Sequence, residues 1–246
     1  MSVELFSRAW PVVRFDEIDS TNEEARRRAV SGDAGPCWLV TDAQTAGRGR
    51  LGRQWSSPRG NLFTTALLPY PRPATEASLA PFAAGLAVID AAQASGVNVS
   101  WLKLKWPNDV LCGEAKLAGI LIETGMLHGG LWMAAGFGVN VEVAPERADR
   151  RTACLTELPG GQNLTATRLL AALDVAFRAR LFGLLNDGFE PTRTAWLDRA
   201  AYLNKSVVVN GVAGLMTGLA GDGALVLQAP DGSESHVRAG ELSVLN

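Results

Sequence analysis

Gly47-Arg48-Gly49-Arg50-Leu51-Gly52-Arg53-Gln54-Trp55 is the most informative stretch of this chain. Glycine lets a backbone approach a ligand closely, and arginine offers paired donors to a phosphate or a carboxylate. No acidic residue occurs between Asp42 and Glu76, although the whole chain carries a net charge of -2. The positive charge is therefore local, which indicates a site for one anionic ligand.

Taken alone, this segment leaves three interpretations open. Most Gly/Arg-rich segments are solvated surface loops, some are Arg-Gly arms that bind RNA or DNA, and others hold nucleotide phosphates. The letters Gly47-x-Gly49-x-x-Gly52 fit the dinucleotide pattern but lack its setting between a strand and a helix, and no Gly-Lys-Ser/Thr closes a P-loop. By itself the segment favours the surface loop.

The composition indicates a folded, soluble chain with one large domain, or with one large and one small domain. Its 246 residues are 47% hydrophobic and 20% charged, and it has no run of about 18 apolar residues that would span a membrane. The acidic start at Glu4 argues against a secretory signal. We therefore expect a cytoplasmic protein that does not bind a membrane.

Cysteine and histidine are too sparse for the common metal and nucleophile sites. Cys37, Cys112 and Cys154 lie far apart, and the only histidines are His128 and His236. This pattern supports neither a disulfide framework, nor a metal cluster, nor a Ser-His-Asp triad. The chemistry must rest on Arg, Lys, Asp and backbone groups.

The apolar periodicity predicts an α+β fold with a mixed, largely antiparallel sheet flanked by helices. A helix is expected from Ser20 to Val30, with a capping box of Ser20 and Glu23 or of Thr21 and Glu24. Strands are expected over 38–41, 62–68 (ended by the proline-rich stretch 69–73), 101–105, 116–123 and 131–141, and helices over 79–89, 169–181 and 191–202. The last two strands should form an antiparallel hairpin with its turn over 125–130.

From about Asn204 the sequence changes to short strands separated by Gly-rich turns. The expected strands lie at 206–209, 215–219, 224–228, 236–238 and 242–244, with hairpin turns at 221–223 and 231–232. This pattern predicts a small all-β barrel that leans on the rest of the chain. We therefore expect a catalytic domain over 1–202 and a small β domain over 203–246.

Two further segments carry lysines close to strand ends. Lys105-Trp106-Pro107-Asn108-Asp109 combines a cation, an amide and a carboxylate at a turn, where Asn and Asp are also common for structural reasons. In 116–123, strict alternation would put Lys116 on the same face as Ala118, Ile120 and Ile122. A lysine there either extends its ammonium group to solvent or points at a buried anion.

A third segment, 135–141, has glycine at alternate positions. Gly136 and Gly138 cost stability in a strand, which makes sense if a flat ligand lies over it. A bulge or a bend in the sheet explains the pair equally well. Gly119 in the neighbouring predicted strand likewise leaves room for a ligand or for another backbone.

In order and spacing, these segments resemble those of the biotin protein ligases. The resemblance runs from about Val13 to the C-terminus and rests on Ser20-Thr21-Asn22, Gln44, the Gly47–Trp55 stretch, Lys105-Trp106-Pro107-Asn108-Asp109, Lys116-Leu117-Ala118-Gly119-Ile120 and Gly136-x-Gly138-x-Asn140. It implies the fold that biotin ligases share with class II aminoacyl-tRNA synthetases. It also implies an SH3-like form for the C-terminal barrel.

The resemblance implies a two-step reaction with biotin, ATP and Mg²⁺. The biotin carboxylate attacks the α-phosphorus of ATP and yields biotinyl-5′-adenylate and pyrophosphate. A lysine of a biotin carboxyl carrier protein domain then attacks the adenylate and releases AMP. Such chemistry needs positioned cations rather than an enzyme nucleophile, which suits this composition.

The resemblance also implies the roles of individual residues. The biotin-binding set is Ser20, Thr21, Asn22, Gln44, Arg48, Gly49, Arg50, Lys116, Gly119 and Ile120, with Ala118 and Ile122 beside the biotin tail. The ATP- or adenylate-binding set is Gly47, Arg50, Arg53, Trp55, Lys105, Asn108 and Asn140. Catalysis falls to Lys116, Arg48, Arg53 and Asp109. Asp109 is also the expected Mg²⁺ ligand, unless Asn108 and Asp109 steer the acceptor lysine. The charged segment 142–151 is expected to close over the nucleotide.

Several alternatives remain open at this level. Some members of the family carry an N-terminal DNA-binding domain, but here Ser20 lies almost at the start of the chain, so we expect no DNA binding. A homodimer is compatible with the sequence. The alternative functions are a lipoate–protein ligase-like activity, a nucleic-acid-binding module that uses the Arg-Gly loop, and a protein that only binds biotin.

Overall fold

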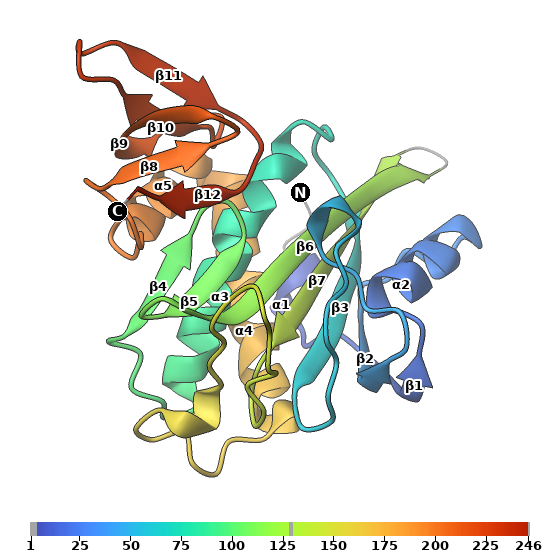
Figure 1. The fold of residues 1–246 in the computed structure, drawn as a ribbon. Coiled ribbons are helices and arrows are strands. Elements are labelled where there is room, and N and C mark those ends of the chain that lie inside the picture. Colours follow the sequence, from blue (N-terminus) through green and yellow to red (C-terminus); the bar gives the residue numbers. More distant parts are fainter. Residues whose placement is uncertain (1–3, 128–129, 246) are drawn as a thin grey trace.

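A seven-stranded sheet forms the centre of the molecule in the computed structural model, which describes residues 4–127 and 130–245 (Figure 1). Its strands are β1 (Val12–Ile18), β2 (Cys37–Gln44), β3 (Leu62–Tyr70), β4 (Leu102–Lys105), β5 (Asp109–Cys112), β6 (Ala115–Leu127) and β7 (Gly130–Val139), in the order β1-β2-β3-β7-β6-β5-β4. Strands β1 and β2 pair in parallel, and the other neighbours pair antiparallel. The predicted mixed, largely antiparallel sheet is confirmed, although β1 and β5 were not anticipated.

Helices cover both faces of this sheet (Figure 1). One face carries α1 (Glu4–Ser7), α3 (Ala80–Ala94), the turn η2 (Glu76–Leu79) and α4 (Ala166–Asp187), and the other carries α2 (Thr21–Val30). α5 (Phe189–Leu197) packs on α3 and α4. The largest apolar core lies under α3 and α4. The stretch Glu76–Ala94 is long and apolar enough to cross a membrane by composition alone, but α3 is largely buried in this core.

The hairpin predicted around residues 125–130 is formed by β6 and β7, which pair from Ala118 with Val139 to Leu127 with Gly130. His128 and the tip of the predicted turn lie outside the described residues. Strand β3 runs through Pro69 and ends at Tyr70, inside the proline-rich stretch 69–73 that was predicted to stop it. Pairing with β2 reaches only Leu67, and proline is tolerated where no further strand needs its missing N–H.

The capping box predicted for α2 does not form. Ser20 is the N-cap residue, but its side chain makes no capping hydrogen bond. Instead, Glu24 forms ion pairs with Arg27 and Arg28, while the Thr21 hydroxyl lies near Gln44 and Thr65. The Thr21 hydroxyl is thus directed toward the interior of the molecule, and the Glu24 carboxylate toward the next turn of the helix; neither caps the helix end.

The C-terminal segments form a second, antiparallel sheet. Its strands are β8 (Ser206–Val209), β9 (Val212–Leu219), β10 (Leu225–Gln228), β11 (Glu234–Val237) and β12 (Leu242–Val244), ordered β11-β10-β9-β8-β12. Trp106 donates its indole N–H to the Gly223 carbonyl at 3.1 Å, and Arg193 donates to Leu219 at 2.6 Å. This sheet shares the main core. The SH3-like form and the division at residue 202 stay predictions.

Candidate active site

One cavity collects almost all of the predicted site residues. It opens between the start of α2, the Gly47–Trp55 hairpin and strands β6 and β7. The exceptions are Gly47, Lys105, Ala118 and Ile122, which do not line it. Its lining residues are Ser20, Thr21, Asn22, Gln44, Arg48, Gly49, Arg50, Arg53, Gln54, Trp55, Ser56, Asn108, Asp109, Lys116, Gly119, Ile120, Leu121, Gly136, Phe137, Gly138, Asn140, Pro145, Arg147, Arg150 and Thr152.

The Gly47–Trp55 stretch is a closed hairpin with an exposed tip. The Gly49 N–H donates to the Arg53 carbonyl at 2.7 Å, and the Trp55 N–H donates to the Gly47 carbonyl at 2.9 Å. Gly47 allows this closure, because a Cβ there would lie 2.6 Å from the Trp55 carbonyl oxygen. Leu51 and Gly52 turn the tip with φ angles of 57° and 73°.

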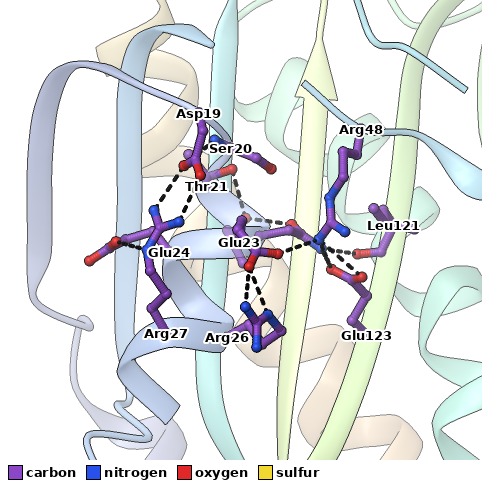
Figure 2. A network of polar contacts seen from close by, with 12 residues as sticks. Asp19, Ser20, Thr21, Glu23, Glu24, Arg26, Arg27, Arg48, Leu121 and Glu123 are labelled. Atoms are coloured by element: carbon purple, nitrogen blue, oxygen red, sulfur yellow. Dashed lines mark hydrogen bonds and ion pairs between the residues drawn. The ribbon is translucent and has the colours of Figure 1, made fainter. Parts of the chain in front are cut away.

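Two arginines of this hairpin form ion pairs with carboxylates from different parts of the chain. Arg48 lies between Glu23 and Glu123 (Figure 2), at 3.2 Å and 3.3 Å from their carboxylates. Arg53 lies 2.6 Å from Glu241, which precedes β12. These pairs also argue against an arm that offers its cations to a nucleic acid.

Arg50 has a different environment. Its guanidinium lies 3.3 Å from the Asn108 side-chain oxygen and 3.5 Å from the Gly240 carbonyl. Among the described residues no carboxylate forms an ion pair with it, and burial lowers the pKa of Arg50. Within this hairpin, Arg50 is therefore the arginine best placed to receive an anionic ligand.

Lys116 and Asp109 form a largely buried ion pair. The Lys116 ammonium lies 2.7 Å from the Asp109 carboxylate and 5.3 Å from the centre of the Trp55 ring. Their side chains are 16% and 12% exposed. Burial lowers the pKa of Lys116, and Asp109 opposes that effect. Burial thus disfavours the charged form of Lys116, and the Asp109 carboxylate favours it.

The face predicted for Lys116 was wrong because the strand is irregular there. Leu111 of β5 pairs with Lys116 and Val110 pairs with Ala118, so Leu117 is an extra residue. This β-bulge places the Lys116 side chain on the same face as Gly119. A Cβ added to Gly119 would lie 3.3 Å from the Cε atom of Lys116. Ala118 and Ile120 belong to the main core, and Ile122 packs against it; of these, Ile120 also reaches the cavity.

The alternate glycines accommodate side chains of this same chain. A Cβ on Gly119 would lie 2.9 Å from the Trp55 ring, and one on Gly138 would lie 2.5 Å from it. A Cβ on Gly136 would lie 2.0 Å from the Asn22 side-chain oxygen. The flat group over these strands is thus Trp55 itself. Its buried indole N–H has no hydrogen-bond partner in the described structure.

Asn108 and Asn140 hold the backbone around the cavity. Asn108 donates its amide to the Ile120 carbonyl at 2.6 Å and accepts from Arg50. Asn140 is buried and donates to the carbonyls of Lys116 and Ala153. Both residues therefore set the position of β6 as well as lining the site.

The segment after Asn140 also reaches the cavity, through Pro145, Arg147, Arg150 and Thr152. Its charged composition is the sequence signal that suggested a role beside the ligand. Asp149 pairs with both arginines. Within the described residues, no group of three His, Cys, Asp or Glu side chains could hold a metal ion.

Fold and cavity together define an α+β protein with one cavity lined by several arginines and by Lys116, and the chain is similar to known proteins. Residues 15–137 match the biotin/lipoate A/B protein ligase family. The biotin–[acetyl-CoA-carboxylase] ligase of Paracoccus denitrificans is 36% identical over 225 residues, which cover 88% of this chain and 93% of that protein. The bifunctional ligase/repressor BirA of Escherichia coli is 30% identical over 237 residues, 92% of this chain and 72% of that protein.

A solved structure agrees with these relatives. The biotin protein ligase from Aquifex aeolicus in complex with biotin and ATP matches with a TM-score of 0.78 and 28% identity, over 96% of this chain and 98% of that one. The chain therefore belongs to the biotin/lipoate A/B protein ligase family.

Proposed function

We propose that this chain activates biotin with ATP and transfers it to a lysine of a biotin carboxyl carrier protein domain. It is an ATP-dependent ligase. In the first step a carboxylate oxygen of biotin forms a bond to the α-phosphorus, the bond to the bridging oxygen breaks, and pyrophosphate leaves. In the second step the acceptor amine attacks the acyl carbon, loses a proton and displaces AMP.

The observation that carries this proposal is the convergence of Arg50 and Lys116 on one cavity without an enzyme nucleophile. Two anions meet in the first step, so fixed positive charge lowers the repulsion between them and stabilises the negative oxygens of the transition state. Within the part of the chain that the structure describes, Arg50 forms no ion pair with a carboxylate, and Lys116 lines the cavity beside Trp55. We assign both to the biotin carboxylate and the α-phosphate.

The remaining assignments follow the positions around the cavity. Ser20, Thr21 and Gln44 would hold the ureido ring of biotin at the start of α2. Trp55, which lines the cavity, would lie beside the adenine. Arg48 and Arg53, tied to carboxylates, would fix the hairpin that carries Arg50.

Mg²⁺ would arrive with the phosphates of ATP, as it commonly does at such sites. Asp109 does not fit as a metal ligand on its own, because Lys116 already occupies one of its carboxylate oxygens. We instead assign Asp109 to holding Lys116 in its charged form. Closure of the segment 142–151 over the nucleotide, a homodimer, a cytoplasmic location and the absence of DNA binding remain predictions.

The test is transfer of biotin to an isolated carrier domain, followed by mass spectrometry with ATP and Mg²⁺ present. A carrier with its acceptor lysine replaced by arginine is the control. We expect one biotin on the intact carrier and none on the control. Modification by lipoate in place of biotin would move the chain to a lipoate–protein ligase-like activity. No modification of a carrier by either acid would contradict the proposal.

A further inference from the structure

Thr65 is a fully buried threonine of β3 that the reaction described above does not use. Its hydroxyl oxygen lies 2.8 Å from the Thr21 hydroxyl and 2.7 Å from the Asn22 side-chain oxygen. It is 0% exposed and does not line the cavity. Thr65 therefore contacts the start of α2 from behind, on the side away from any ligand.

The orientation of the Asn22 amide is fixed by its other neighbours. Its nitrogen donates to the Leu121 carbonyl at 3.3 Å and to the Glu123 carboxylate at 2.8 Å. A carbonyl and a carboxylate can only accept, so the nitrogen must face them and the side-chain oxygen must face Thr65. Glu123 is in turn held by Arg48 (Figure 2).

The number of protons then fixes the direction of each hydrogen bond. The Asn22 oxygen carries no proton, so the single proton of the Thr65 hydroxyl goes to it. The Thr65 oxygen can then only accept from Thr21. The opposite arrangement, with Thr65 donating to Thr21 and Thr21 to Gln44 at 3.3 Å, would leave the buried Asn22 oxygen without a donor, which is costly.

Gln44 does not need the hydroxyl proton of Thr21. Its side-chain oxygen already accepts the Thr21 backbone N–H at 2.9 Å, and its nitrogen donates to Ser57 at 3.1 Å. The Thr21 hydroxyl therefore donates its proton to Thr65. Toward the cavity, which Thr21 lines, the hydroxyl oxygen has only lone pairs left and can act only as a hydrogen-bond acceptor.

From this chain of hydrogen bonds we infer that Thr65 is a positioning residue that makes Thr21 a hydrogen-bond acceptor and so selects a ligand with an N–H at that point. This inference rests on the proposed function and deepens it, because the ureido ring of biotin carries two N–H groups. A ring with an oxygen in place of the N–H that faces Thr21 would set two acceptors against each other. Such a ligand should be rejected.

The experiment measures direct binding, without ATP, of biotin and of its two cyclic carbamate analogues, in each of which one ureido N–H is replaced by oxygen. The wild-type protein should prefer biotin over one of the analogues by on the order of tenfold or more. In Thr65→Val the Thr21 hydroxyl is free to rotate and to donate its proton to the ligand. The ratio of the Kd of the rejected analogue to the Kd of biotin should therefore fall close to one. Thr65→Ser restores the hydroxyl and should restore the preference.

Thr64→Val is the matched control. Thr64 is also fully buried and adjacent in β3, but its hydroxyl donates to the Leu39 carbonyl at 3.0 Å. Thr64→Val should lower the unfolding temperature as Thr65→Val does, with the ligand preference intact. If Thr65→Val does not fold, Thr65→Ala carries the same test.

The outcomes separate this inference from the proposed function. If the wild-type protein binds biotin and the Thr65 variants keep its preference, the role of Thr65 is refuted while the proposed function stands. An equal loss of preference in Thr64→Val would also refute it, because a general loosening of β3 would then be the cause. If the folded wild-type protein does not bind biotin at all, both fail.

Discussion

The exchange of Asp109 for asparagine tests the ion pair at the centre of the site. It leaves the Lys116 ammonium in a largely buried position without its counter-ion, 2.7 Å away in the native protein. Breaking a buried pair by removing one partner typically costs 3–5 kcal/mol. We expect about 3 kcal/mol here, since both side chains retain some exposure. For a chain of this length this lowers Tm by roughly 6–12 °C.

Asp109→Asn should also change the pH dependence of adenylate formation. Burial lowers the pKa of Lys116 and Asp109 opposes that effect, so its removal lowers the pKa further. If the charged lysine is needed, the loss of activity on the alkaline side must move to lower pH. The assay is biotin-dependent pyrophosphate exchange as a function of pH, together with thermal unfolding.

The double variant Asp109→Asn/Lys116→Met is the control for stability. Because it removes both charges, it should be more stable than Asp109→Asn alone, with a coupling energy of about 1–3 kcal/mol in the double-mutant cycle. An alkaline limb that stays in place or moves to higher pH in Asp109→Asn would refute the reasoning. So would additive losses of stability.

Three further changes test other parts of the structure. Gly138→Ala sets a methyl group 2.5 Å from the Trp55 ring. It should lower the free energy of unfolding by about 1–3 kcal/mol in urea and raise the KM for ATP. An unchanged KM would count against the placement of Trp55 beside the nucleotide. Glu241→Gln should lower the free energy of unfolding by less than about 1 kcal/mol, because the side chains of Glu241 and Arg53 are 46% and 40% exposed. A larger loss of stability in thermal unfolding would contradict a weak surface ion pair. Burial raises the pKa of Tyr70 to about 12, so stability should fall by about 2–3 kcal/mol between pH 10 and pH 12 as the unfolded chain ionises first. Tyr70→Phe should make this alkaline loss smaller in pH-dependent urea unfolding, while half-buried Tyr202, whose pKa is also raised by burial, keeps its own part of it.

The residue types and their order along the chain were sufficient to predict the α+β fold and the gathering of the site. Strands with clear apolar runs, such as β3, β6 and β7, could be read directly. β1 and β5 were missed because β1 is mostly exposed and carries charges, while β5 is a four-residue strand that begins at the last residue of a predicted turn. A strand that is stabilised mainly by pairing with its neighbours has little strand-forming pattern in its own sequence.

The roles inside the site depend on tertiary contacts that no spacing encodes. One bulged residue, Leu117, reverses the face on which Lys116 lies. The alternate glycines that suggested a flat ligand face side chains from far earlier in the sequence, Gly138 facing Trp55 and Gly136 facing Asn22. Thr65 gives no sequence signal at all, since a threonine in a buried strand is ordinary.

The central claim, that this cavity joins biotin to AMP, is tested most directly by ATP–pyrophosphate exchange with the purified wild-type protein, Mg²⁺ and either biotin or lipoate. The account predicts rapid exchange with biotin and none with lipoate or without an acid. Exchange with lipoate alone, or no exchange with either acid in protein shown to be folded, would contradict it.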